Sequence, residues 1–372
     1  MTRGRFAPSP TGRMHLGNVF CALLSWLSAK SKGGEWVLRI EDLDPQRSKK
    51  DYALQLMDDL QWLDLPWDGE PVWQSQRGGI YEEYLQRLTD MGLTYPCYCT
   101  RADIMATQAP HETDGRVVYK GTCRPSTSSP LTPHPSPLTA TTHLIVPDCT
   151  IPFTDGHYGK HDINLAEHCG DYIIRRKDGA WAYQLAVVVD DALMGVTEIV
   201  RGRDLLLSSP QQIHLRELLF QSTENSVQST EYRVQITDDL LKQETDSLNV
   251  DSFTPQIVPL RQGDERNGGG GLTAHLSSLN VQHSTFNIHR SPLTVDFFHH
   301  PLLCNAEGQR LCKRDKSMDL GYLRGTGITP QEIIGKLAYL AGLTDTTTPI
   351  TPSELLPLFS WKKVPTEDII LK

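Results

Sequence analysis

The stretch APSPTGRMHLGN, residues 7–18, separates two apolar segments near the start of the sequence. Residues 3–7 are short and strand-like, and residues 18–30 are apolar enough to predict a buried helix. Backbone amides at the start of a helix attract anions, and a neighbouring histidine such as His15 can donate a hydrogen bond to a phosphoryl oxygen. The stretch therefore predicts a nucleotide site, although a lone histidine after a Pro/Gly turn is also common as a structural residue.

The alternation of strand and helix continues through the first hundred residues. EWVLRIEDLD, residues 35–44, reads as a strand that ends in a cluster of acids, and helices are expected at about 49–63 and 79–91. Such alternation is typical of a parallel α/β layer. Residues 329–343 (TPQEIIGKLAYLAGL) predict a later helix, because Thr, Pro and Glu stand where an N-cap, a first helical position and a capping box need them.

The middle of the chain has a β pattern followed by polar stretches. Residues 171–191 (DYIIRRKDGAWAYQLAVVVDD) predict a hairpin that reverses at Asp178-Gly179, with LAVVV as a strand buried on both faces. Residues 204–220 predict a helix. The Pro/Ser/Thr-rich residues 125–140 predict a surface loop, and the polar residues 222–292, which contain NGGGG, predict an insertion that is largely loop or disordered.

Composition and charge limit the classes of protein to consider. The chain has 372 residues, 38% of them hydrophobic, so it can bury a real core. Its net charge of -9 argues against a protein that coats nucleic acid through a global positive field, although clusters such as residues 175–177 leave room for a local basic face. No run of eighteen apolar residues occurs, so we expect no membrane span, a cytoplasmic location and, by default, a monomer.

The eight cysteines do not resemble the disulfide framework of a small secreted protein. Three of them are close in sequence: Cys97, Cys99 and Cys123. They supply three soft ligands, whereas zinc requires four in a tetrahedron, and His111 in the same region is a conventional fourth ligand. Three reduced cysteines without a metal remain the alternative, because the Cys-x-Cys spacing is shorter than the usual structural pair.

The segment PSPTGRMHLGN resembles the HIGH motif of class I aminoacyl-tRNA synthetases, in the form found in the glutamyl subgroup. Three more blocks of that family follow in the expected order: RIEDLD (39–44), AYQLAVVVDDALMGVTEIVRGRDLL (182–206) and RLCKR (310–314). The resemblance spans residues 3–221 and 297–343. It implies a Rossmann-like α/β catalytic domain that activates an amino acid with ATP and Mg²⁺.

Within this subgroup the chain is most similar to the paralogues that attach glutamate to queuosine in tRNA(Asp). The motifs CYCTR and YKGTC resemble the zinc site of those paralogues and imply Tyr119 as the fourth ligand. About sixty residues follow the RLCKR block, too few for the additional helical domains of a full glutamyl-tRNA synthetase. Two alternatives remain: a truncated glutamyl-tRNA synthetase that charges the tRNA 3′ end, and an inactive synthetase-like RNA-binding module.

The resemblance also implies which residues bind glutamate. Arg5 and Arg201 supply cations for a carboxylate, Glu41 supplies an anion for the α-ammonium group, and Tyr183 supplies a hydroxyl. The adjoining wall consists of Phe6, Ala7, Pro8 and Ser9. Arginine suits a carboxylate because its planar fork can bind both oxygens. Read one at a time, Glu41 could instead belong to a surface acid cluster with Asp42 and Asp44, and Arg201 could pair with Asp204.

The ATP-binding residues implied by the resemblance are His15, Gly17, Asn18 and Lys313. His15 and Lys313 are the expected catalytic residues, which stabilise charge as pyrophosphate leaves. The block GQRLCKRDKS, residues 308–317, resembles the KMSKS motif with Lys313 as its second lysine. Arg310 and Cys312 depart from that motif, and a second alignment would place Lys316-Ser317 as its closing pair.

Together these patterns predict five segments. The first half of the catalytic domain covers residues 1–96, and a zinc-bearing insertion with the Pro/Ser/Thr-rich loop covers 97–170. The second half of the catalytic domain covers 171–221. The polar insertion covers 222–292, and the KMSKS-like loop with a short C-terminal helical region covers 293–372. We expect ATP at the carboxyl ends of the parallel strands.

Overall fold

The computed structural model describes residues 1–100, 103, 118–125, 140–220, 294–311 and 318–371. These residues belong to one unit of the chain, made of Met1–Gln221 and Arg290–Lys372. The expected polar insertion at 222–292 and nearly all of the expected loop at 125–140 lie outside the described residues.

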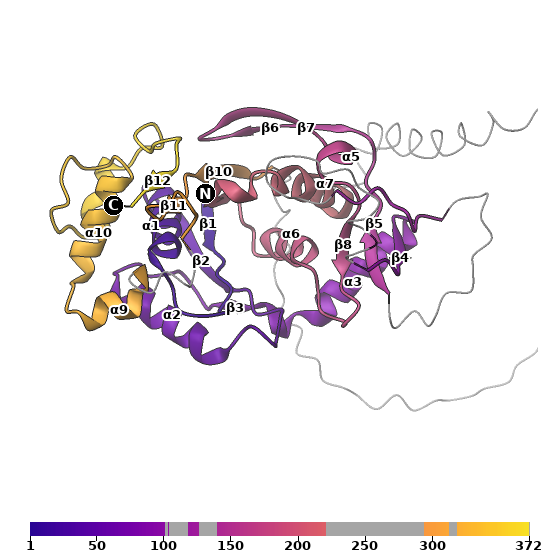
Figure 1. Cartoon of the computed structure of the whole chain (residues 1–372), viewed down its shortest axis with the longest axis horizontal. Helices are drawn as coiled ribbons and strands as arrows, with labels where there is room; N and C mark the ends of the chain where they lie inside the picture. The colour runs from indigo at the N-terminus through magenta and orange to yellow at the C-terminus, as the bar shows by residue number, and fades with distance from the viewer. Residues whose placement is uncertain (101–102, 104–117, 126–139, 221–293, 312–317, 372) are drawn as a thin grey trace, which may run out of the picture. The chain divides into compact units, whose positions relative to one another are not determined.

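A central sheet of seven strands has the order β3-β2-β1-β9-β10-β6-β7 (Figure 1). Its strands are β1 (Arg3–Phe6), β2 (Glu35–Ile40), β3 (Val72–Trp73), β6 (Thr150–Asp155), β7 (Gly159–Asn164), β9 (Glu198–Gly202) and β10 (Asp296–His300). Neighbouring strands run parallel except β6 and β7, which form an antiparallel hairpin. The parallel strands with helical crossovers confirm the Rossmann-like α/β fold.

The helices of the sequence prediction form close to their expected positions. These are α1 (Leu16–Lys30), α2 (Lys50–Trp62), α3 (Gly78–Asp90) and α7 (Ser208–Phe220). A further long helix, α6 (Tyr183–Leu193), forms where the sequence predicted a strand. Helix α1 connects the parallel strands β1 and β2 and is buried along most of its length. Among the helices that the structure describes, none is both long and apolar enough to cross a membrane.

Two smaller sheets accompany the central one. Strands β4 (Thr94–Cys97), β5 (Thr141–Leu144) and β8 (Tyr172–Arg175) form an antiparallel sheet. Strands β11 (Leu303–Cys304) and β12 (Ile369–Ile370) pair in parallel. Because β6 and β7 extend the central sheet, part of the segment 97–170, which the sequence assigned to an insertion, belongs to the same layer as β1, β2 and β9.

The prediction that LAVVV forms a strand is wrong, because these residues lie in helix α6. All residues from Leu185 to Ala192 are buried, so the run is apolar on every side and its pattern cannot distinguish a buried helix from a buried strand. The reversal at Asp178-Gly179 does occur: Arg176 N donates to Ala180 O at 2.9 Å, and Gly179 has a φ of 81°. Asp190 and Asp191 therefore lie in the last turn of a buried helix.

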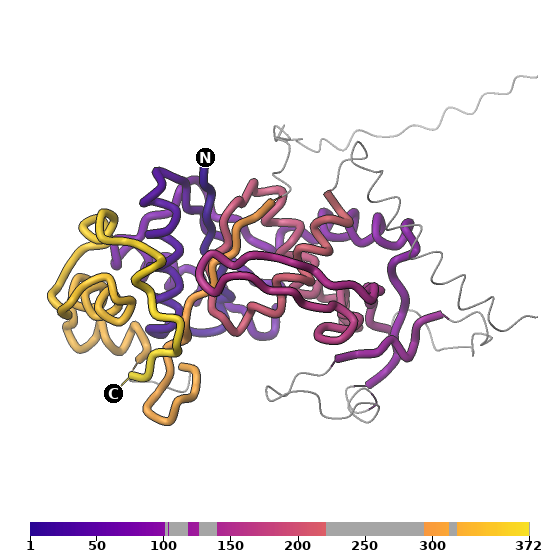
Figure 2. Tube along the Cα trace, turned by 90° about the horizontal axis from the view of Figure 1, so that it is seen from above, coloured from indigo at the N-terminus to yellow at the C-terminus, as the bar shows by residue number. Residues whose placement is uncertain are grey.

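The C-terminal residues contain α9 (Leu320–Gly325), α10 (Pro330–Leu340) and α11 (Pro352–Leu355). Helix α10 has the predicted capping box, in which Thr329 and Glu332 bond each other's backbone amides. The end of the chain passes beside the turn between β6 and β7, where His157 Nε2 lies 3.0 Å from Pro365 O (Figure 2). The Trp361 ring stacks on Phe298 of β10, with 5.0 Å between the centroids.

A buried group of charges joins β1 and β2 to α6. Arg39 is fully buried, and its Nη1 donates to Asp191 Oδ1 at 2.5 Å. The same Asp191 oxygen lies 3.5 Å from Arg5 Nε. The neighbouring Asp190 accepts hydrogen bonds from Gln74, Arg77 and Tyr81. A buried carboxylate is stable only with such partners, so these acids hold α6 against the strands.

We predict that Asp191→Asn lowers the free energy of unfolding by about 3 kcal/mol, because the amide keeps the shape but leaves Arg5 and Arg39 without the charge between them. Urea unfolding of the purified chain measures this difference. The matched control is Asp345→Asn, since Asp345 is exposed and such surface changes stay within about 0.5 kcal/mol. A loss no larger than that of the control would contradict the role of Asp191.

Candidate functional site

His15 caps the start of helix α1. Its Nδ1 accepts a hydrogen bond from Gly17 N at 3.1 Å, and its backbone N donates to Asn18 Oδ1 at 3.1 Å. Because Nδ1 is an acceptor, the neutral ring carries its proton on Nε2, the atom that can donate to a ligand oxygen. A Cβ at Gly17 would lie 3.0 Å from the imidazole ring, so glycine lets the ring fold over the helix start.

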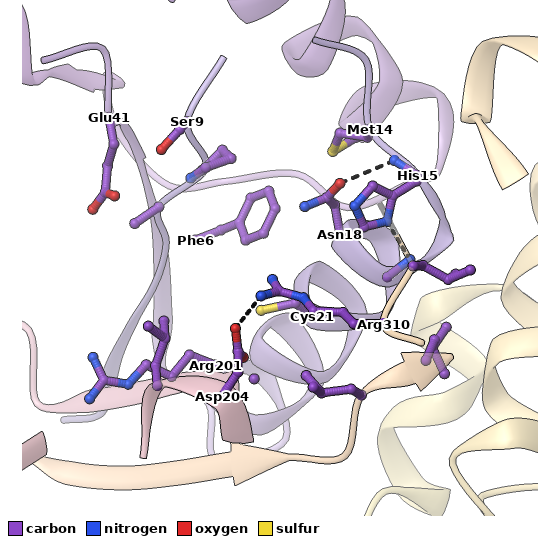
Figure 3. A pocket seen from close by; sticks show the side chains of 18 of the residues that line it. Phe6, Ser9, Met14, His15, Asn18, Cys21, Glu41, Arg201, Asp204 and Arg310 are labelled. Carbon is purple, nitrogen blue, oxygen red and sulfur yellow. Dashed lines mark hydrogen bonds and ion pairs between the residues drawn. The ribbon is translucent and has the colours of Figure 1, made fainter. Parts of the chain in front are cut away.

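A cavity of about 470 Å³ opens beside this helix start (Figure 3). It lies where β1, β2, β9 and β10 end, which is where parallel sheets place their ligands. The cavity is lined by all the described residues that were expected from the sequence to bind glutamate or ATP: Arg5, Phe6, Ala7, Pro8, Ser9, His15, Gly17, Asn18, Glu41, Tyr183 and Arg201. Lys313 lies outside the described residues.

Glu41 lies at the end of the cavity opposite His15 (Figure 3). Its Oε1 accepts from Arg39 Nη2 at 3.2 Å, and its side chain is only 9% exposed. Burial raises the pKa of Glu41, while the charges of Arg39 and Arg5 act in the opposite direction. Glu41 therefore belongs to the cavity, and the alternative of a surface cluster with Asp42 and Asp44 is not what the structure shows.

Arg201 is buried on the same side of the cavity as Glu41 (Figure 3). Its Nε donates to His299 Nε2 at 3.0 Å, its Nη1 to Gln212 at 2.7 Å and its Nη2 to Ser209 at 2.8 Å. These contacts use three of the five N–H groups of a guanidinium, so Arg201 has hydrogens left for a ligand carboxylate or for Tyr183.

The alternative pairing of Arg201 with Asp204 does not occur in the structure. Asp204 instead forms an ion pair with Arg310, which also lines the cavity. Beyond residues 312–317, Leu320 N donates to Met14 O at 2.9 Å. Arg310, just before residues 312–317, thus lines the cavity, and Leu320, just after them, bonds the turn that precedes α1.

Sequence reasoning missed the buried charges behind the end of the cavity that Glu41 and Arg201 line. Arg39 lies inside strand β2, and Asp191 lies in α6, which the sequence had assigned to a strand. The one available signal was the pair Asp190-Asp191 at the end of an apolar run, because charged residues in such a place need buried partners. Which cations they meet follows only from the packing of α6 against β1 and β2.

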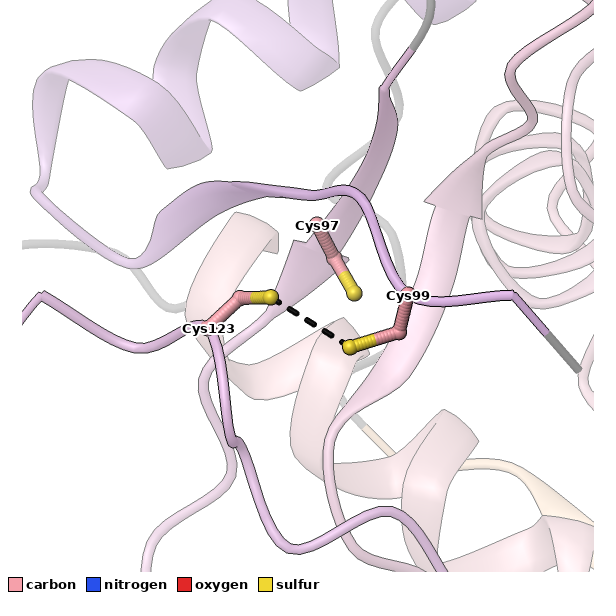
Figure 4. A group of neighbouring side chains, drawn as sticks. All are labelled: Cys97, Cys99 and Cys123. Carbon is pink, nitrogen blue, oxygen red and sulfur yellow. Dashed lines mark hydrogen bonds between the residues drawn. The ribbon is translucent and has the colours of Figure 1, made fainter. Parts of the chain in front are cut away.

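The three cysteines of the expected metal site lie together (Figure 4). Their sulfur atoms are within 4.8 Å of one another. Tyr119 Oη lies 3.3 Å from Cys97 Sγ and 3.6 Å from Cys99 Sγ, and accepts a hydrogen bond from Cys123 N at 2.9 Å. This donor set could hold a metal ion with a preference for sulfur. The alternative ligand His111 lies outside the described residues.

The comparisons with known proteins agree with this geometry. Residues 1–250 match the family described as tRNA synthetases class I (E and Q), catalytic domain. The glutamyl-Q tRNA(Asp) synthetase of Symbiobacterium thermophilum is 36% identical over 380 residues, which cover 99% of this chain and 95% of that protein. The protein of the same name from Neisseria meningitidis serogroup C is 48% identical over 219 residues, which cover 59% of this chain and 72% of that protein.

Solved structures show the same fold. The glutamate tRNA ligase from Elizabethkingia meningosepticum, in complex with its amino acid, has a TM-score of 0.68 and 23% identity, and the match covers 100% of this chain and 67% of that one. The glutamate-tRNA synthetase from Elizabethkingia anophelis has a TM-score of 0.69 and 23% identity. With the family match over two thirds of its length, the chain belongs to the class I tRNA synthetases of the E and Q group.

Proposed function

We propose that this ligase activates L-glutamate with ATP and transfers the glutamyl group to queuosine at the wobble position of tRNA(Asp). The observation that carries the first step is a single cavity with the buried Arg5 and Arg201 and the nearly buried Glu41 at one end and the start of α1 at the other. The second step is supported by the names of the relatives, one of which is 36% identical in an alignment that covers 99% of the chain.

At the glutamate end, Arg201 is suited to bind a carboxylate, because the acceptors that hold it, His299, Gln212 and Ser209, are all uncharged. Arg5 adds a second cation on the same wall. Glu41 is suited to bind the α-ammonium group. With its side chain and ammonium group held there, glutamate can direct its α-carboxylate toward ATP, and this positioning lowers the activation barrier.

At the other end, ATP lies against the start of α1. The α-carboxylate attacks the α-phosphorus in line, which gives glutamyl-adenylate and pyrophosphate without a covalent enzyme intermediate. His15 donates from Nε2 to a phosphoryl oxygen as negative charge builds up, and the Mg²⁺ that arrives with ATP neutralises further charge. We assign Lys313 a contact with the leaving phosphates on the motif alone.

We predict that His15→Asn lowers the rate of glutamate-dependent ATP/pyrophosphate exchange about tenfold to a thousandfold, the cost of losing one charge-stabilising donor. The asparagine oxygen replaces Nδ1 as the acceptor for Gly17 N, so this variant should remain as stable as the wild type. His15→Ala removes both functions and should also lose about 1 kcal/mol of stability. An unchanged rate in the Asn variant would exclude the assigned role.

The acceptor is tested with labelled glutamate, ATP and tRNA from cells that contain or lack queuosine. We expect label only on the queuosine-containing tRNA, because the cyclopentene-diol of queuosine supplies the hydroxyl that takes the glutamyl group. Equal label on both tRNAs would favour the alternative of 3′-end charging. Absence of label together with absence of ATP/pyrophosphate exchange would instead favour an inactive RNA-binding module.

We further propose that Cys97, Cys99, Cys123 and Tyr119 bind one structural Zn²⁺. The convergence of three sulfurs and one phenol oxygen supports this, since zinc favours four ligands with sulfur among them. The ion would connect the end of β4 to residues 118–125, which come later in the chain.

We expect elemental analysis to find one zinc per wild-type chain and none in Cys99→Ser, because this change removes one of the three thiolates that zinc binds most strongly, and a serine hydroxyl is a poor substitute. Cys149→Ser is the control, since Cys149 lies outside the cluster. Tyr119→Phe should keep zinc, but it should lose the ion to a chelator that is too weak to remove zinc from the wild-type chain. If Tyr119→Phe holds zinc as tightly as the wild type, another residue is the fourth ligand.

A further inference from the structure

A buried histidine outside the cavity lining, His299, connects Arg201 to the buried carboxylate of Asp155. His299 in β10 is 0% exposed, and Asp155 at the end of β6 is 1% exposed. Arg201 Nε donates to His299 Nε2 at 3.0 Å, and His299 Nδ1 lies 2.6 Å from Asp155 Oδ2. The three side chains come from β9, β10 and β6, which are neighbours in the sheet.

The contacts fix the protonation state of His299. A guanidinium can only donate, so His299 Nε2 must be the acceptor, and the single ring proton lies on Nδ1. That proton is donated to Asp155, which is a carboxylate in this arrangement. Burial lowers the pKa of His299, which favours the neutral ring required here.

Asp155 is itself held in one orientation. Its Oδ1 accepts from His157 N at 3.0 Å and from Tyr158 N at 2.8 Å, in the turn between β6 and β7. Its Oδ2 is therefore the oxygen that faces the imidazole. The backbone of this turn thus determines which oxygen faces His299, and His299 determines which of its nitrogens faces Arg201.

We infer that Asp155 and His299 are positioning residues for glutamate binding, which hold the Arg201 guanidinium in the orientation that receives the ligand carboxylate. This inference rests on the proposed function. Arginine has several rotatable bonds, and fixing them before the ligand arrives removes an entropic cost from binding. Ser209 and Gln212 hold the two terminal nitrogens of Arg201, and His299 holds the third.

Two substitutions at His299 separate its two contacts. His299→Gln places an amide oxygen near the position of Nε2 and keeps an acceptor for Arg201. His299→Asn places an amide nitrogen near the position of Nδ1 and keeps the donor to Asp155, but the shorter side chain has no atom that reaches Arg201. Both variants remove the ring from the same site, so a purely structural role would make them behave alike.

The experiment measures ATP/pyrophosphate exchange at varied glutamate and varied ATP with the full chain, after thermal unfolding has verified that each variant folds. We expect His299→Asn to raise the KM for glutamate about tenfold to a hundredfold, the cost of a lost hydrogen bond to a charged group. The KM for ATP should stay within about threefold, and His299→Gln should retain a nearly normal KM for glutamate.

Asp155→Asn tests the other end of the connection. Because the amides of His157 and Tyr158 require an oxygen at the Oδ1 position, the new NH2 group takes the Oδ2 position. There it faces His299 Nδ1 and also loses the 3.1 Å hydrogen bond from His299 N. The imidazole then carries its proton on Nε2, where it meets the Arg201 N–H. We expect the same rise in the KM for glutamate as in His299→Asn, and no further rise when Asp155→Asn is added to His299→Gln.

Nitrogen NMR of the wild-type chain with labelled histidine provides a readout independent of any variant, and should find His299 Nε2 unprotonated. A protonated Nε2, or equal KM values for glutamate in His299→Asn and His299→Gln, would overturn the inference while leaving the proposed function intact. A wild-type chain without glutamate-dependent exchange would overturn the proposed function and the inference with it.

Discussion

The carboxylate of Asp191 lies between the guanidinium groups of Arg5 and Arg39, and the end of the cavity proposed to bind glutamate depends on this arrangement. The three residues belong to α6, β1 and β2, so one buried anion holds a helix against two neighbouring strands. Arg39 in turn donates to Glu41 and directs that carboxylate at the cavity. The packing of the fold and the orientation of the binding groups therefore share the same contacts.

The two ends of the cavity differ in what they offer a ligand. One end has charged side chains whose geometry is fixed by burial, and the other has the start of α1, which offers a partial positive charge and the imidazole of His15. Glutamate has two groups that suit the first end, a carboxylate and an ammonium group. Once these are bound there, the α-carboxylate is the part that remains to face the helix start, where phosphate oxygens are favoured.

The fold was largely predictable from local sequence patterns, whereas most of the cavity lining was predictable only through the resemblance to the synthetase family. The Pro/Gly turn before α1 predicts a strand, a helix and an anion site together. The resemblance to the family implied Arg5, Glu41, Tyr183 and Arg201 as one binding site, and all four line the same cavity. The assignment of LAVVV failed because a run that is buried on all sides has no period to read. No local pattern could find Asp155 and His299, since 144 residues separate them and only the strand order joins them.

The interposed imidazole has a consequence for the electrostatics of the site. If Asp155 contacted Arg201 directly, its charge would neutralise the guanidinium and compete with the carboxylate of the ligand. His299 is neutral and fixes the direction of Arg201 Nε, while the negative charge of Asp155 stays one ring further away. Arg5 differs, because it shares Asp191 with Arg39 and is partly neutralised before any ligand binds. Arg201 therefore keeps more of its positive charge than Arg5 does, and under the proposed function the carboxylate of glutamate would supply the counter-charge that a buried guanidinium requires.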